Sequence, residues 1–213
     1  MSDSVESPRS DVPASRSRRG QSLVEFALVL PMLLVLLLGV ADFGRVFAAG
    51  VVLEASARNA AEAAAQEYLQ LCRNRSTCPP LDHADYVAIH EVAREEACRE
   101  AQRLPNRAVD GSGNCYQPAI AVCIHDGHDT LCAHEAAGAP GDCTALHAMS
   151  SSPSNPAPAL YPGEPALPYV EVVTCYQFTT LFALSDLDLP LGWSISLGDV
   201  WLQRDRTFTV ADY

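Results

Sequence analysis

The sequence predicts an α+β protein in which a single N-terminal membrane-spanning helix extends into a long helix. A small disulfide-containing extracytoplasmic head with a few antiparallel strands follows. Three observations predict this class. Residues 26–41 carry no charge, residues 48–71 are rich in alanine, and strand-forming segments appear only beyond residue 117. The eight cysteines all lie beyond both helical segments: Cys72, Cys78, Cys98, Cys115, Cys123, Cys132, Cys143 and Cys175.

Cysteines confined to the region beyond an apolar segment indicate disulfide bonds in an oxidising compartment. Eight cysteines allow ~105 pairings, so the sequence leaves the connectivity open. The alternative interpretation is a set of reduced, buried cysteines in a cytosolic domain.

Residues 1–20 are rich in serine, proline, arginine and aspartate, and we expect a disordered leader there. Four of the 14 basic residues, which are all arginines, precede Gly20, while acidic residues dominate beyond the apolar run. This asymmetry places the N-terminus in the cytoplasm and the head outside. The chain has a net charge of −12 and no basic stripe, so nucleic acid is excluded as a partner.

The apolar run is short for a membrane span. Its 16 uncharged residues cover roughly 24 Å as a helix, whereas a full span needs about 20 residues. We therefore predict a transmembrane helix over residues 21–47, with Glu25 near one interface. Asp42 and Arg45 lie near the other interface and can pair at i, i+3.

Pro31 is expected to kink this helix, because proline has no backbone N–H to donate and its ring crowds the preceding turn.

The alanine-rich residues 48–71 predict an extracytoplasmic continuation of the same helix. Glu54 and Arg58 form an i, i+4 pair in the favourable order. Gly39, Gly44 and Gly50 are the weak points of this rod. Small side chains along a helix allow close approach of neighbouring helices.

Residues 72–213 are expected to form the cysteine-containing head, beginning where residues 72–80 break the helix. A second helix is predicted from Asp82, its N-cap, to Leu104, with Pro105 as the stop. Residues 150–168 are proline-rich and predict an extended loop. Strands are predicted at residues 118–124, 169–180, 193–202 and 207–210.

The junction of leader and apolar run is the most informative part of the sequence. It reads Gly20-Gln21-Ser22-Leu23-Val24-Glu25-Phe26, preceded by two arginines. This arrangement resembles the processing site of type IV pilin-like proteins. The longer segment, with Gly20, Glu25-Phe26, Pro31 and Asp42-Phe43-Gly44-Arg45, resembles the TadE-like pseudopilins of tight-adherence (Flp-type) pili.

The resemblance implies that a prepilin peptidase cuts between Gly20 and Gln21. It also implies that Phe26, Pro31, Asp42 and Arg45 belong to the shared packing helix. The expected partners are other pilin subunits, pilus-assembly membrane proteins, the peptidase and the membrane. The expected function is that of a minor pilin assisting pilus initiation, assembly or tip presentation, in the membrane or in the extracellular pilus.

A physical reason for the spacing of Glu25 follows from this cut. Cleavage frees an α-amine on Gln21, and Glu25 lies four residues on, about 6 Å along a helix. A carboxylate without a counter-ion costs roughly 2.5–3.5 kcal/mol inside a membrane helix. An amine from the same or a neighbouring subunit offsets this cost, which makes Glu25 an assembly register. The alternatives are a carboxylate that merely sits in the headgroup layer, and a cyclised rather than N-methylated Gln21.

Other patterns compete with this interpretation. The small residues around Ala49 fit the cleavage rule of a conventional secretory signal, with the cut before Ala49. Asp42 and Arg45, which lie between the apolar run and this site, argue against such a signal. His125, His128, Cys132 and His134 offer metal ligands at spacings that match no defined zinc site.

Asp126, Gly127 and Asp129 lack the later ligands of a calcium loop, and His83 and His90 are expected to be solvated. We therefore expect no bound metal and no cofactor.

No nucleophile elbow, phosphate loop or metallohydrolase motif is present, so we expect no enzymatic activity. The alternative to a minor pilin is a single-pass membrane-anchored extracytoplasmic binding or adhesion module, which does not assemble and whose head recognises a surface ligand. A secreted metallohydrolase built on His125, His128 and His134 is a third, weaker hypothesis.

Overall fold

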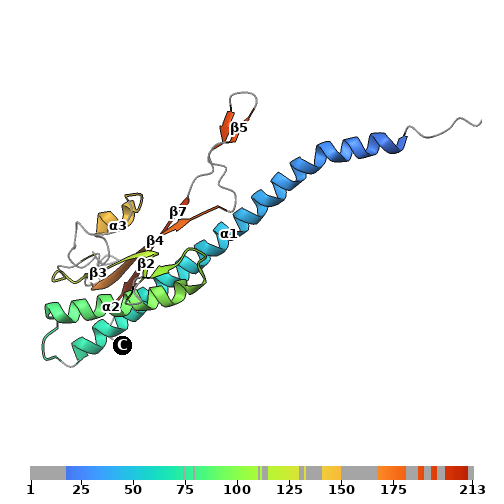
Figure 1. Cartoon of the computed structure of the whole chain (residues 1–213). Helices are drawn as coiled ribbons and strands as arrows, with labels where there is room; N and C mark the ends of the chain where they lie inside the picture. The colour runs from blue at the N-terminus through green and yellow to red at the C-terminus, as the bar shows by residue number, and fades with distance from the viewer. Residues whose placement is uncertain are drawn as a thin grey trace, which may run out of the picture. The chain divides into compact units, whose positions relative to one another are not determined.

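The computed structural model describes residues 18–73, 75–78, 80–109, 111, 115–129, 132, 141–149, 167–180, 187–189, 193–195 and 200–210 (Figure 1). Most of the predicted leader and of the proline-rich loop lies outside these residues. The chain divides into two compact units, Met1–Phe43 and Gly44–Tyr213. Helix and antiparallel strands are both present, so the predicted α+β class is confirmed.

Helix α1 spans Arg18–Arg73 and contains Pro31. It continues without a break through the three glycines that we expected to weaken it, and at two of these, Gly39 and Gly44, the space beside the backbone is open. Alanine, leucine and glutamate on either side are strong helix formers, which offsets the cost of single glycines. The helix ends just after Cys72, where the sequence predicted a break.

Helix α2 spans His83–Glu100 and starts as predicted after Asp82. The Asp85 carboxylate accepts a hydrogen bond from the Asp82 backbone N–H at 3.0 Å, which satisfies a donor at the start of the helix. The last predicted turn is a short 3-10 helix, η1 (Ala101–Arg103). Leu104 then adopts an extended conformation before Pro105.

The main sheet has three antiparallel strands in the order β3-β4-β7. Strand β3 spans Ala119–His125, β4 spans Tyr169–Phe178 and β7 spans Val200–Thr209. In this register Val172 lies opposite Val122 on one side and Arg206 on the other. Strands β3 and β4 agree closely with the sequence prediction.

Two small antiparallel ribbons complete the described strands. One pairs β1 (Ala108–Val109) with β2 (Cys115–Gln117), and the other pairs β5 (Leu187–Leu189) with β6 (Trp193–Ile195). The predicted strand 193–202 is therefore wrong as one element. Its first residues form β6, and its last residues belong to β7, which also absorbs most of the predicted strand 207–210.

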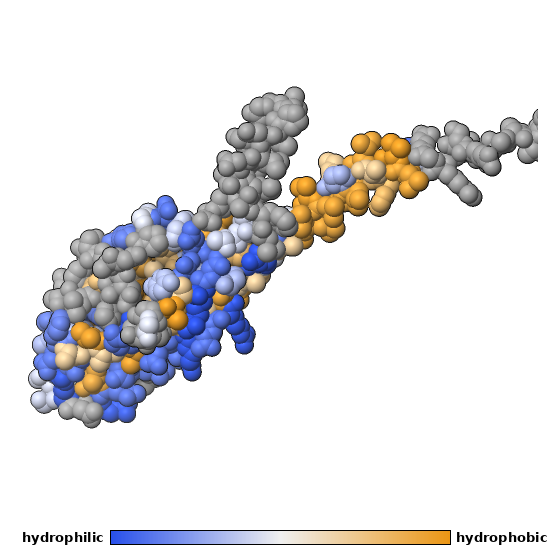
Figure 2. Space-filling view, viewed as in Figure 1, coloured by the Kyte–Doolittle hydropathy of each residue, from blue (hydrophilic) through white to orange (hydrophobic). Residues whose placement is uncertain are grey.

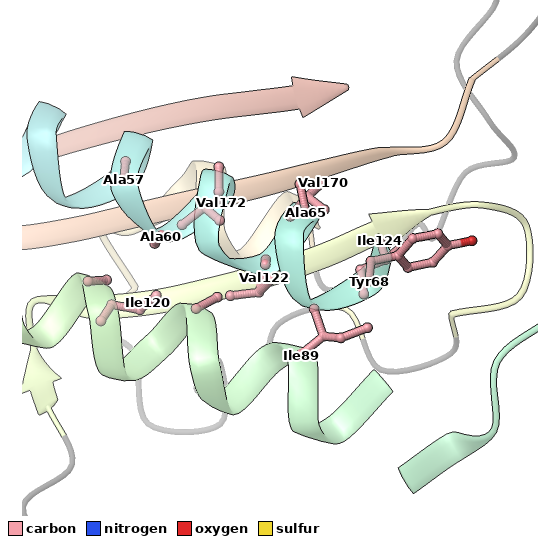
Figure 3. Close-up of a cluster of buried hydrophobic side chains, with 14 of the residues drawn as sticks. Ala57, Ala60, Ala65, Tyr68, Ile89, Ile120, Val122, Ile124, Val170 and Val172 are labelled. Carbon is pink, nitrogen blue, oxygen red and sulfur yellow. The ribbon is translucent and has the colours of Figure 1, made fainter. Parts of the chain in front are cut away.

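The head core lies between the two helices and one face of the sheet. Figure 3 shows α1 side chains such as Ala60 and Tyr68 converging with Ile89 of α2 and with Val122 and Val172 of the sheet. The opposite face is covered by α3 (Thr144–Met149), through Leu146 and Met149. Because both faces are buried, β4 lacks the polar face that a half-exposed strand shows.

All eight cysteines are paired, so the prediction of disulfides is confirmed. The cysteines pair two by two in chain order, the first with the second and so on, with Cα–Cα distances of 4.3–5.8 Å. The bonds close the α1–α2 loop, join α2 to β2, tie the loop after β3 back to that strand, and join the residue before α3 to β4. The pairs are Cys72–Cys78, Cys98–Cys115, Cys123–Cys132 and Cys143–Cys175.

Candidate functional site

The first half of α1 carries a surface of large apolar side chains. Leu23 is 71% exposed, Leu28 74% and Met32 79%, and the exposed series continues to Phe43. Figure 2 shows this part of α1 as a largely apolar surface. Among the described residues, α1 is the one helix long and apolar enough to cross a membrane. Such a surface is costly in water, so it requires lipid or other apolar helices around it.

Glu25 lies inside this apolar surface. Its neighbours Val24 and Phe26 are 61% and 58% exposed, and Glu25 itself is exposed on the same helix. Gly20 and Gln21 lie in the first turns of α1, so Gln21 and Glu25 are separated by one helical turn. Their assigned roles in processing and register remain predictions.

Arg45 contacts the head. Its guanidinium lies over the ring of Phe178, 5.1 Å from the ring centroid, in a cation–π contact at the end of β4. Burial raises the pKa of the neighbouring Tyr176, while a hydrogen bond from the Asn106 N–H and the charge of Arg45 act in the opposite direction. The sequence suggested a membrane-interface residue here, and gave no signal for this contact with β4.

The alanine-rich part of α1 packs inside the head. Ala57, Ala60 and Ala64 have no exposed surface, and the hydroxyl of Ser56 donates a hydrogen bond to the Ala97 carbonyl of α2 at 2.8 Å. The small residues thus allow a neighbouring helix, α2, to approach α1 closely, as the sequence predicted. The close approach that alanine permits is used between α1, α2 and the sheet of the same chain.

The predicted Glu54–Arg58 pair is also replaced. Glu54 accepts hydrogen bonds from Arg206 and lies 3.7 Å from the guanidinium Nε of Arg204, both on β7. These ion pairs are partly exposed, so each contributes little stability. They do place the charged middle of β7 against α1.

His125, one of the histidines considered as metal ligands, takes part in structural contacts. His125 is buried, stacks on Tyr169 with ring centroids 4.2 Å apart, and has Nε2 2.9 Å from Glu171 Oε2. His128 is exposed, and His134 lies outside the described residues. Cys132 lies close to Asp129, but its sulfur is bonded to Cys123 and is not a thiolate ligand.

His90 was expected to be solvated, and this expectation is wrong. Its side chain is 1% exposed, and Nε2 lies 2.9 Å from Oδ2 of Asp129, which also accepts the Ile124 N–H. Asp129 lies 39 residues away along the chain, so no periodicity within α2 could reveal the partner.

A second buried carboxylate joins three elements. Asp126 accepts hydrogen bonds from the hydroxyls of Tyr68 on α1 at 3.1 Å and of Tyr86 on α2 at 2.5 Å. Its other oxygen accepts the backbone N–H groups of His128 and Asp129. Burial, reinforced by the Asp126 carboxylate, raises the pKa of both tyrosines well above the ordinary value. No pattern in the sequence pointed to this network.

In the residues that the structure describes, the geometry is that of a protein with one candidate membrane span and a disulfide-bonded α+β head. Residues 20–62 match the family model described as TadE-like protein, and this match covers Gly20, Glu25-Phe26, Pro31 and Asp42-Phe43-Gly44-Arg45. The chain therefore carries a TadE-like N-terminal segment, as predicted. No curated protein and no solved structure matches the chain.

Proposed function

We propose that this protein is a minor pilin of a tight-adherence pilus, assisting pilus initiation, assembly or tip presentation. The TadE-like segment supports association with such a pilus and with the membrane. The observation that carries the proposal is the exposed apolar surface of α1 around Glu25. A chain of this kind acts through recognition and packing, without chemistry of its own.

The first step in this proposal is processing. A prepilin peptidase cuts between Gly20 and Gln21 on the cytoplasmic side, which removes the arginine-rich leader and frees the amine of Gln21. The leader arginines support this orientation, because basic residues stay on the cytoplasmic side. The head then lies in the oxidising compartment where disulfides persist, in agreement with the four disulfides.

The second step is registration of subunits. The carboxylate of Glu25 pairs with a Gln21 amine, and a neighbouring subunit shifted by about one turn supplies that amine during assembly. The pairing offsets the cost of a carboxylate in lipid, and so fixes the stagger between two helices. The surrounding side chains, which are exposed in the single chain, pack against the other subunits.

The buried alanine surface supports a division of α1 into two functions. The segment before Gly44 is available to lipid and to other subunits, while the segment beyond it holds the head together. In this proposal, assembly contacts therefore concentrate on the first segment.

The test uses Glu25→Ala and Glu25→Gln in the native host, with Glu62→Ala as the control. Glu62 lies on the same helix within the TadE-like match, and its carboxylate accepts a hydrogen bond from Gln66. We expect both Glu25 variants to be processed normally but to reduce the chain in sheared pili at least about tenfold, since 1.4 kcal/mol already corresponds to that factor.

Two results would contradict the proposal. If the Glu25 variants assemble like the wild-type chain, Glu25 is not a register. If the wild-type chain is absent from pili and its deletion leaves pilus number unchanged, the protein is a membrane-anchored binding module that does not assemble.

A further inference from the structure

A cavity of about 510 Å³ lies between α1 and the end of α2. On the α1 side it is lined by Val51, Val52 and Ala55, and on the other side by Arg99 and Arg103. All of these residues belong to the unit Gly44–Tyr213. One wall is thus apolar and the other carries two guanidinium groups, which suits an amphiphilic ligand with a negative charge.

The apolar wall continues toward the candidate membrane span. Phe47 is 68% exposed and Val51 is 55% exposed, and their i, i+4 spacing places them on one face of α1. Phe47 ends the predicted span, and Val51 lies about 6 Å further along the helix axis. An apolar strip therefore runs from the membrane end of α1 into the cavity.

The cationic wall is available for a ligand. Within the described part of the chain, Arg103 makes no hydrogen bond or ion pair. Arg99 pairs with Glu96, but its side chain remains 64% exposed. Glu100 also lines the cavity and weakens the positive potential, so the attraction for an anion rests mainly on Arg103.

We propose that this cavity binds the headgroup of an anionic phospholipid from the leaflet that surrounds α1. The phosphate lies at Arg103 and Arg99, and the first carbons of an acyl chain lie along Val51 and Phe47. Guanidinium groups bind phosphate oxygens through parallel N–H donors, which favours arginine in this position. The contact fixes the base of the head at the membrane surface. This proposal requires α1 to span the membrane, but it does not depend on pilus assembly.

The test uses the full-length chain purified in mild detergent and mixed with equal amounts of phosphatidylglycerol and phosphatidylcholine. Native mass spectrometry counts the lipids retained. The key variant is Arg103→Gln, which breaks no hydrogen bond or ion pair among the described residues, and Arg99→Gln/Arg103→Gln removes both cations. Arg58→Gln and Arg58→Gln/Arg73→Gln are the charge-matched controls, because both arginines are exposed on α1 and neither lines this cavity.

We expect the wild-type chain to retain phosphatidylglycerol in preference. Arg103→Gln should lower that preference about fivefold, the effect of roughly one basic residue at a lipid surface, and the double variant should lower it further. The controls should change it less than twofold. Equal losses in cavity and control variants, or a wild-type chain without headgroup preference, would overturn the proposal.

A second measurement separates lipid from a protein occupant. A photoreactive residue in place of Gln102, which also lines the cavity, is activated in native membranes. A crosslinked product heavier by one phospholipid supports the proposal. A product crosslinked to another polypeptide, with no lipid adduct, would show that a protein partner occupies the cavity and would overturn it.

Discussion

The hydroxyl of Ser56 donates a hydrogen bond to the carbonyl oxygen of Ala97 at 2.8 Å, and this contact joins α1 to α2 where both are fully buried. The neighbouring alanines allow the two helices to approach this closely. The alanine-rich part of α1 is therefore a component of the head core. Its buried alanines are thus not available for contacts of α1 with other subunits.

Overpacking this contact is expected to destabilise the head. Ala60 has no exposed surface, so Ala60→Leu should lower the free energy of unfolding by about 1–3 kcal/mol, because the extra carbons overpack the core shared by α1, α2 and the sheet. Ala48→Leu, on the exposed face of the same helix, is the control and should change it little. Urea unfolding followed by circular dichroism measures both. Equal stability of the two variants would show that the alanine face is not buried in solution.

The disulfides are expected to differ in their contributions. Peptide mapping without reduction should recover the four pairs between consecutive cysteines. Cys143–Cys175 closes a separation of 32 residues and Cys72–Cys78 one of 6. Chain entropy then predicts losses of about 4 and about 2 kcal/mol when each pair is replaced by alanine. Crossed pairings in the map, or a larger loss for the shorter loop, would contradict this account.

The stability of the head is expected to fall at alkaline pH. A raised tyrosine pKa means that the folded chain keeps a proton that the unfolded chain loses near pH 10, so stabilisation present below about pH 10 is lost above it. Tyr86→Phe should be less stable than wild type at neutral pH, since Asp126 loses a donor, but should show a shallower decline between about pH 10 and about pH 11.5.

Tyr68→Phe should behave in the same way as Tyr86→Phe, because both hydroxyls donate to Asp126. Tyr116→Phe is the control, because Tyr116 is 58% exposed and lies on β2. Thermal unfolding across this pH range provides the measurement. A decline of the same slope in all variants would show that the Asp126 network does not control the alkaline transition.

The sequence predicted correctly the helices and strands that are marked by a clear local pattern. The uncharged run and the alanine-rich segment predicted α1, Asp82 and Pro105 bounded α2, and the valine-rich run predicted β4. The TadE-like segment was recognisable from Gly20, Glu25 and the residues around Asp42, because these residues lie within one short stretch of the sequence.

Relationships between distant residues could not be predicted. The sequence predicted one strand ending at residue 202 and another starting at residue 207, yet residues 203–206 lie within β7, which pairs with β4 throughout. The burial of His90 depends on its contact with Asp129, which is distant in the sequence. Small residues on a helix permit contacts within one chain as well as between chains, so they do not identify the neighbouring helix. Disulfide pairing likewise required the fold.

The central claim is that proteolysis creates the cation which Glu25 recognises, and the mass of the mature N-terminal peptide tests it most directly. For chain isolated from the native host, the account predicts a peptide beginning at Gln21 with an intact or methylated amine. Gly20→Leu should abolish that cut. Wild-type chain that retains residues 1–20, or whose Gln21 amine is lost by cyclisation, would contradict the account.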